Sequence, residues 1–148
     1  MTPREIINLS SGLFNVNEKW GDLDKMNPLI LQMLIHARRT IGKPFIINSG
    51  YREGDKGQHG KGNAVDWYIK DMRYLEAIAE METWLKRSIT IGGEIFHLDS
   101  FCGFGLYPYW NNCGFHLDCR GVKARWAYDK EGKEIPYNDG KDIVAGRG

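Results

Sequence analysis

The stretch that decides the fold is residues 58–69, "QHGKGNAVDWYI". Glycines interrupt its first half, whereas Ala, Val, Trp, Tyr and Ile from position 64 onward favour an extended strand. His59 therefore belongs to a loop, and Asp66 belongs to the strand that follows it. Because side chains alternate along a strand, Asp66 faces the side opposite Val65 and Trp67. The segment predicts a strand with one apolar face and one polar face, toward which the loop histidine folds back.

A later strand presents a polar pair of the same kind. In "GFHLDC", residues 114–119, alternation places Phe115 on one face and His116 with Asp118 on the other. If the two strands share a sheet, Asp66 and His116 converge, and two imidazoles with one carboxylate form a zinc site with an open position for water. A histidine and an aspartate seven residues apart are common by chance, so spacing alone favours an ordinary surface histidine.

The rest of the chain predicts one α+β domain over residues 1–137, with an antiparallel sheet packed with helices, and a flexible tail over residues 138–148. Residues 28–41 form an amphipathic helix that begins with Pro and ends before Gly42. A second helix is expected from Asp71, as its N-cap, to residue 88. Helical segments precede most of the strand segments, an order that favours the α+β class.

The charge balance and the cysteines exclude several classes of protein. The 148 residues include 20 basic and 19 acidic side chains, so we expect no nucleic-acid partner. The N-terminus has no apolar region typical of a signal peptide, and no apolar run is long enough for a membrane helix. Cys102, Cys113 and Cys119 contain no C-x-x-C pair, which favours ordinary packing and leaves a local disulfide between Cys113 and Cys119 open.

Four motifs occur in a characteristic order: "SGYR" at 49–52, H-x-x-G-x-A-x-D at 59–66, G-x-G-x-Y-P at 103–108 and "GFHLD" at 114–118. Together they resemble the M15 family of zinc peptidases, the D-alanyl-D-alanine carboxypeptidase-like group that shares its fold with the Hedgehog signalling domain. The likeness is greatest to the small branch found in phages and in bacterial cell-wall enzymes. It spans about Phe14 to Trp126 and implies a Hedgehog/DD-peptidase-like fold.

The resemblance implies three zinc ligands, His59, Asp66 and His116. It also implies that Arg52 binds substrate or stabilises the oxyanion, since a guanidinium near the metal neutralises charge that develops on the scissile carbonyl oxygen. The simpler interpretation is a loop arginine paired with Glu53 or Asp55. Tyr51 and Tyr107 lie on loops around the predicted site and are candidates for contacts with a peptide substrate.

The sequence leaves the identity of the general base open. Many relatives carry an acidic residue three positions before the last histidine, where this chain has Cys113, and a serine two positions before the first, where it has Gly57. Asp118 is the replacement candidate, because its i,i+2 relation to the last histidine places both on one face. It equally fits a carboxylate that orients a ligand histidine. Glu94 and His97 are further candidates for the base.

The tetrapeptide "FHLD" occurs twice, at 96–99 and at 115–118, so His97 competes with His116 as the third ligand. We favour His116, because it follows "GFGLYP" and a turn and leads into "CRGVKARW", as in the family.

The resemblance implies a hydrolase: a zinc metallopeptidase of the D-Ala-D-Ala carboxypeptidase or L-Ala-D-Glu endopeptidase type, which hydrolyses peptidoglycan stem peptides with metal-activated water. The alternative is a non-catalytic zinc-binding module with a structural or recognition role in a phage particle or cell envelope. Because the sequence shows no signal peptide, we expect a phage virion protein or one released from the host cell to the wall, and otherwise a cytoplasmic one. No membrane partner is expected.

Overall fold

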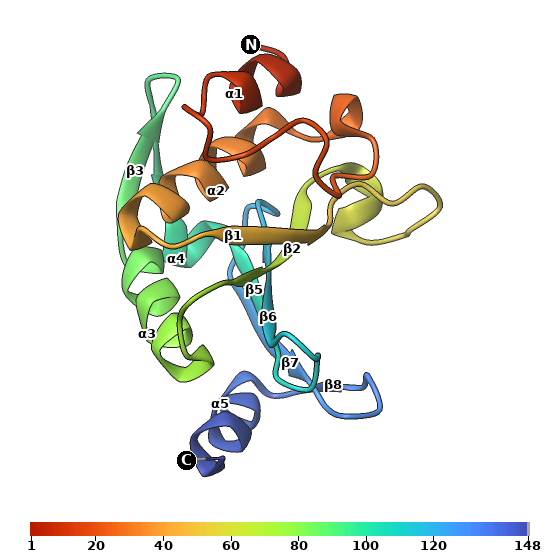
Figure 1. The fold of residues 1–148 in the computed structure, drawn as a ribbon, viewed down its shortest axis with the longest axis vertical. Coiled ribbons are helices and arrows are strands. Elements are labelled where there is room, and N and C mark those ends of the chain that lie inside the picture. Colours follow the sequence, from red (N-terminus) through yellow and green to blue (C-terminus); the bar gives the residue numbers. More distant parts are fainter. Residues whose placement is uncertain (148) are drawn as a thin grey trace.

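A six-stranded sheet forms the centre of the computed structural model, which describes residues 1–147 (Figure 1). Its strands, in spatial order, are β1 (Phe45–Ser49), β2 (Ala64–Ile69), β6 (Gly114–Asp118), β5 (Gly103–Tyr107), β7 (Ala124–Tyr128) and β8 (Glu134–Ile135). A separate hairpin consists of β3 (Ser88–Ile91) and β4 (Glu94–His97). The structure therefore confirms a mixture of helices and sheet within the described residues.

The sheet is mixed rather than antiparallel, which corrects the expectation from the sequence. All its neighbouring strands run antiparallel except β5 and β7, which run parallel. The reason is the position of β6, which pairs with β2 on one edge and with β5 on the other. The returning strand β7 finds both edges of β6 occupied, so it pairs with the free edge of β5, whose direction it shares.

The helical elements comprise five α-helices and two 3-10 turns within the described residues. They are α1 (Pro3–Asn8), the 3-10 turn η1 (Leu23–Lys25), α2 (Pro28–Ile41), the 3-10 turn η2 (Gln58–Lys61), α3 (Tyr74–Leu85), α4 (Leu98–Phe101) and α5 (Tyr137–Gly146). The predicted helix over 28–41 is confirmed at both ends. Asn27 caps its first turn through a bond from the Leu29 N–H, and Gly42 ends it in the left-handed conformation.

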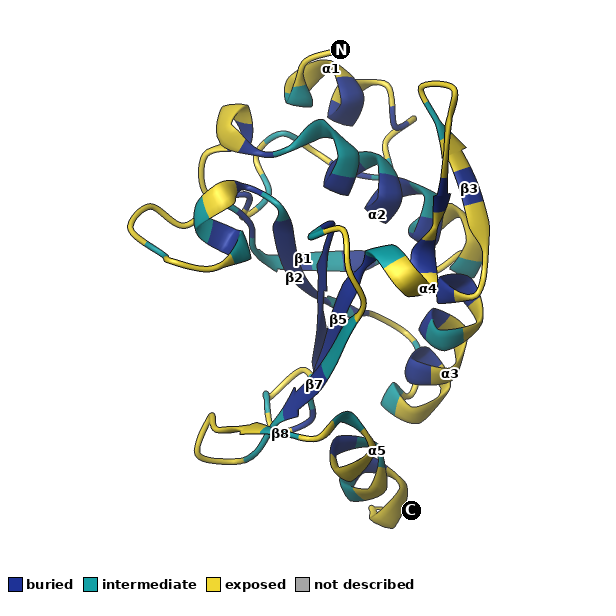
Figure 2. Ribbon diagram, turned by 180° about the vertical axis from the view of Figure 1, so that it is seen from behind, coloured by how far each residue is buried: buried dark blue, intermediate teal, exposed yellow. Residues whose placement is uncertain are grey.

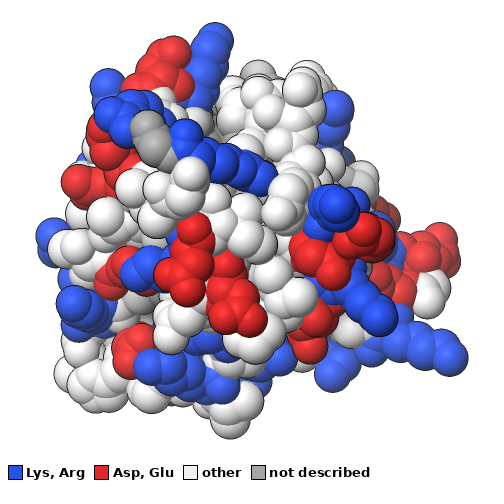
Figure 3. Space-filling view, turned by 90° about the horizontal axis from the view of Figure 1, so that it is seen from below, with Lys and Arg blue, Asp and Glu red and all other residues white. Residues whose placement is uncertain are grey.

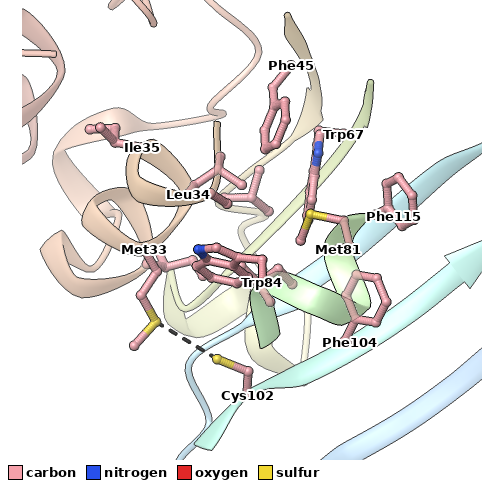
Figure 4. Close-up of a cluster of buried hydrophobic side chains, with 14 of the residues drawn as sticks. Met33, Leu34, Ile35, Phe45, Trp67, Met81, Trp84, Cys102, Phe104 and Phe115 are labelled. Atoms are coloured by element: carbon pink, nitrogen blue, oxygen red, sulfur yellow. Dashed lines mark hydrogen bonds between the residues drawn. The ribbon is translucent and has the colours of Figure 1, made fainter. Parts of the chain in front are cut away.

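One face of the sheet forms the hydrophobic core. Figure 4 shows Met33 and Leu34 of α2 and Met81 and Trp84 of α3 gathered around aromatic side chains of the strands. The aromatic residues there are Phe45, Trp67, Phe104 and Phe115. All eight are essentially inaccessible to solvent, and burying each stabilises the fold by roughly 1.5–3 kcal/mol. In Figure 2 the central strands are accordingly buried while the connecting loops are exposed.

Helix α3 is shorter than the sequence predicts, because it begins at Tyr74 rather than after Asp71. Asp71 has a φ of 63° and lies in a turn that reverses the chain after β2. Aspartate tolerates this left-handed conformation better than most residues. Its role is therefore in the turn, and the N-cap position belongs to Arg73.

The segment predicted as a flexible tail forms helix α5 instead. Val144 is buried, and Gly140 packs so closely that an added Cβ would lie 2.3 Å from the Cβ of Ala127. The Tyr137 hydroxyl donates a hydrogen bond to Glu82 of α3 at 2.8 Å. The polar, glycine-containing sequence of this segment does not predict a helix. The helix forms because the small residue Gly140 allows it to dock against β7. Residue 148 of the expected tail lies outside the described residues.

Charges are mixed on the surface. In Figure 3 the Lys and Arg side chains are interspersed with Asp and Glu side chains across the visible face. Within residues 1–147, no helix has the length and apolar character needed to cross a membrane.

Candidate metal centre

The polar face of the sheet brings together the three predicted ligands. Strands β2 and β6 are neighbours, and their register places Asp66 directly opposite His116. His59 reaches this face from η2, where Gly62 ends the turn with a φ of 73°. A side chain at Gly62 would place its Cβ 2.1 Å from the carbonyl oxygen of Lys25. The close packing of this glycine therefore helps to fix the turn that holds His59 over the sheet.

The three side chains are buried and close enough to bind one metal ion. His59, Asp66 and His116 are 6%, 3% and 5% exposed, and one ligand atom from each lies within 4.8 Å of the others. The His59 Nε2 atom lies 3.1 Å from Asp66 Oδ2, and the His116 Nδ1 atom lies 3.0 Å from Asp66 Oδ1. The two imidazole rings meet nearly edge to face, with centroids 5.2 Å apart.

His59 gives the strongest indication that this group fits a cation. Its Nδ1 lies 2.7 Å from the carbonyl oxygen of Gly50, which only accepts hydrogen bonds, so Nδ1 holds the ring proton. The Nε2 atom lies 3.1 Å from Asp66 Oδ2, is buried and has no hydrogen-bond partner among the described residues. When this nitrogen carries a lone pair, its approach to a carboxylate oxygen is unfavourable by itself, and a metal ion between the two satisfies both.

His116 lies between two carboxylates. Its Nε2 is 2.6 Å from Asp118 Oδ2, and its Nδ1 faces Asp66. Burial alone would lower the pKa of His116, but the hydrogen bonds to Asp118 and Asp66 outweigh it and raise the pKa. The Nε2–H bond to Asp118 leaves Nδ1 as the atom directed at the other ligands, where either a proton or a metal ion balances the charge.

Asp118 lies on the far side of the His116 ring from the other two ligands. It is fully buried, and it accepts hydrogen bonds from the backbone N–H groups of Gly103 and Arg120. The Arg120 guanidinium forms a forked pair with both carboxylate oxygens at 2.9 and 2.7 Å. Burial opposes ionisation, but Arg120 and His116 hold the pKa of Asp118 well below its usual range. The geometry is that of a carboxylate that orients a ligand histidine.

Two further side chains contact the Asp66 carboxylate. The Tyr107 hydroxyl donates to Oδ1 at 3.2 Å, and Arg52 Nη2 donates to Oδ2 at 3.3 Å. Burial would raise the pKa of Asp66, but the hydrogen bond with His116 and the nearness of both imidazole rings lower it to about 2. Arg52 also lies 3.7 Å from Asp55, as the simpler interpretation of this arginine expected, so its guanidinium faces both the loop and the site.

The site lies in the floor of an open cleft of about 590 Å³. Figure 1 shows the loop before β2 and the β7–β8 hairpin projecting on the same side of the sheet, and residues of both segments line the cleft. Arg52 and Tyr107 are in its wall, together with Tyr109 and Trp110. Tyr107 belongs to the end of β5 rather than to a loop, which corrects the expectation from the sequence. Tyr51 is not among the lining residues and instead lies beneath the ammonium group of Lys25.

Sequence reasoning missed several residues of this cleft. Arg120 and Trp126 line it, with the Trp126 ring next to the His116 ring and the Arg120 guanidinium over the Trp126 ring. Gly105 leaves room for the Trp126 ring, because a Cβ at this position would lie 2.7 Å from it. Tyr128 and Glu134 are directly opposite each other in the β7–β8 hairpin. The alternation in "ARWAY" at 124–128 was the available signal, since it places the two aromatic residues on one face.

The other candidates for the base lie elsewhere. Glu94 and His97 belong to the β3–β4 hairpin, are exposed and are not among the residues that line the cleft. The Cys113 thiol donates to the carbonyl oxygen of Pro108 and is likewise not part of the lining. Cys113 and Cys119 are both free thiols, so the local disulfide left open by the sequence is not formed. Asp55, Asp129 and Glu134 are the additional carboxylates of the cleft among the described residues.

Protein-family models, curated proteins and solved structures were compared with this chain, and none of them matched it.

Proposed function

We propose that this protein is a zinc-dependent peptidase that hydrolyses peptidoglycan stem peptides. The observation that supports it most is the buried His59 Nε2 atom, which faces Asp66 Oδ2 at 3.1 Å and has no hydrogen-bond partner among the described residues. With His116 Nδ1 on the other oxygen of Asp66, the donor set is two imidazoles and one carboxylate. This is a set typical of catalytic zinc, which keeps one position for water.

The surroundings of the donor set suit hydrolysis of an extended chain. The cleft is open to solvent between the loop before β2 and the β7–β8 hairpin, which both line it, so the ligands are accessible from an open cleft rather than from a closed cavity. Zinc, when bound, would acidify water and polarise a peptide carbonyl. Arg52, half-exposed and 3.3 Å from Asp66, is placed to donate to the carbonyl oxygen of a substrate as negative charge develops there.

We assign the role of proton acceptor in the reaction to a carboxylate that lines the cleft rather than to Asp118. The described hydrogen bonds of the Asp118 carboxylate come from Gly103, Arg120 and His116, and the residue has no solvent exposure. Asp55 and Glu134 have carboxylates in the lining and remain accessible. A general base must reach the attacking water within hydrogen-bonding distance or through one further water. We propose these two residues as the candidates.

The direct test is incubation of the protein with purified peptidoglycan, with and without a chelator, followed by analysis of new amino and carboxyl termini. New termini that disappear on chelation and return with zinc are expected. Arg52→Lys should retain zinc but lose activity by about a hundredfold, because lysine keeps the charge without the planar fork. Zinc binding without any new termini would overturn the peptidase proposal.

A non-catalytic zinc module is the second candidate, and one observation favours it. The position where the resembling family has an acidic residue is occupied by Cys113, whose thiol bonds to the backbone of its own loop and does not line the cleft. In this case zinc would stabilise the fold, and its removal would lower the melting temperature while peptidoglycan stays intact. The incubation described above separates the two functions.

A further inference from the structure

The orientation of the Asp66 carboxylate is the key variable of the metal centre. Each of its oxygens faces one histidine nitrogen, Oδ1 toward His116 and Oδ2 toward His59. Rotation of the carboxylate about its last torsion would break this match, and that torsion is intrinsically soft. Something must therefore hold the carboxylate in the plane that serves both histidines.

Two side chains contact this carboxylate from outside the ligand set, and they differ in how firmly they are held. Arg52 reaches Oδ2 from a loop, and its side chain is half-exposed and shared with Asp55. Tyr107 reaches Oδ1 from the end of β5 with a hydroxyl that donates a hydrogen bond at 3.2 Å. Only the tyrosine belongs to a regular element of the sheet.

The ring of Tyr107 is clamped on both faces. Trp110 stacks on it with centroids 3.7 Å apart and planes 5° apart, and Tyr128 stacks with centroids 5.0 Å apart and planes 4° apart. The backbone is held as well, because the Tyr107 N–H donates to the hydroxyl of Tyr74, which in turn donates to the carbonyl oxygen of Gly114. The hydroxyl of Tyr107 thus has little freedom to move away from Asp66.

We propose that Tyr107 is a positioning residue for the metal ligand Asp66, and that the stack of Trp110, Tyr107 and Tyr128 exists to aim its hydroxyl at Oδ1. The stack covers both faces of the Tyr107 ring, so this side chain has only its edge and hydroxyl available to the site. This inference rests on the metal site of the proposed function and is independent of any peptidase activity.

The test is Tyr107→Phe, which removes one oxygen and keeps a ring that can stack. Zinc affinity, measured by competition with a chromogenic chelator, should fall by about ten- to a hundredfold, the effect typical of losing a partner that orients a ligand. The visible spectrum of the cobalt-substituted protein should change, because a released carboxylate alters the coordination geometry. Tyr68→Phe, which removes a hydroxyl from β2 at a residue that does not line the cleft, should leave both measurements unchanged.

The clamp has its own pair of variants. Trp110→Ala should weaken zinc binding and change the cobalt spectrum in the same direction as Tyr107→Phe. Trp110→Phe, which keeps an aromatic ring in the stack, should have the zinc affinity and cobalt spectrum of the wild type. Unchanged affinity in Tyr107→Phe, or a fall without spectral change, would overturn the positioning role. Equal behaviour of Trp110→Ala and wild type would overturn the clamp. Failure of the wild-type protein itself to bind zinc would instead refute the metal site, so the two failures are distinguishable.

Discussion

The same tetrapeptide, "FHLD", has opposite fates at its two positions in the chain. At 115–118 it lies in β6, in the interior of the sheet, where His116 is 5% exposed and Asp118 is fully buried. At 96–99 it spans the end of β4 and the start of α4, and His97 is exposed with its Nδ1 2.6 Å from the hydroxyl of Ser88. The difference lies in the neighbours: β6 has a strand on each edge, whereas β4 pairs only with β3.

This comparison shows that local sequence supplies a histidine but pairing makes it a candidate ligand. In β6 the register with β2 sets Asp66 opposite His116. In β4 the corresponding position is opposite Ser88, and the chain leaves the strand directly after His97, so Asp99 turns outward to Lys123 and Arg125. Matched substitutions in the two copies therefore separate the effect of the tetrapeptide from the effect of its surroundings.

The largest expected difference is in stability. Phe115→Ala removes a ring with no solvent exposure from the core and should lower the free energy of unfolding by about 3–5 kcal/mol. Phe96→Ala, in the two-stranded hairpin, should lower it by about 1–2 kcal/mol, because the site is better able to relax. Denaturant unfolding in the presence of a chelator measures both without a contribution from metal. Equal losses would mean that the hairpin is as tightly packed as the sheet.

The second difference is in metal binding. His116→Ala should lower zinc affinity by more than about a hundredfold, since deleting a ligand costs more than deleting the partner that orients it. His97→Ala should leave zinc affinity unchanged. Elemental analysis and chelator competition on both purified variants provide the measurement. Retained zinc in His116→Ala together with lost zinc in His97→Ala would reverse the assignment of the two copies.

A smaller effect is expected from the aspartates. Asp118→Asn should weaken zinc binding by about ten- to a hundredfold, because His116 loses the carboxylate that fixes its ring. Asp99→Asn is the matched control and should leave zinc binding unchanged. Chelator competition and peptidoglycan cleavage are measured on both. Full zinc affinity with lost cleavage in Asp118→Asn would instead identify Asp118 as the general base.

The smallest effect concerns a histidine outside both copies, His36 on α2. The Trp84 Nε1–H donates to its Nδ1 at 2.9 Å, which requires a neutral ring. Burial, with Arg87 and Arg39 nearby, lowers the pKa of His36. The unfolded chain, with a pKa near 6.5, therefore binds the proton more readily, and His36 lowers stability progressively as the pH falls below about 6.5.

Thermal unfolding of wild type and His36→Gln at a series of pH values tests this effect. It also gives the pH dependence of stability that does not arise from the two copies of the tetrapeptide. The difference in stability between the two proteins should shift in favour of His36→Gln as the pH falls from about 7 to 5. Titration of the metal ligands is common to both proteins and cancels in the difference. A difference that stays constant over this range would contradict the requirement for a neutral His36.

The candidate site could be predicted from sequence to the extent that it depends on alternation and on motif order. The face shared by His116 and Asp118 follows from the period of two in a strand, and so does the opposition of Asp66 to Trp67. The motifs supplied His59 and Arg52, and the structure brings both to the cleft. The positions of Glu94 and His97 away from it were not predictable, because they depend on which strands pair.

What the sequence by itself determined is local: the helix at 28–41 with its caps, the strand character of β2 and β6, and the polar face of each of these strands. These follow from side-chain periodicity and from Pro and Gly at the ends of segments. Tertiary structure alone decided the parallel pairing of β7 with β5 and the docking of α5. It also decided the contacts of Tyr107 and Arg120 with the aspartates of the site. The physical reason is that free strand edges, close packing and side-chain hydrogen bonds depend on partners from other elements, whose positions the local pattern does not encode.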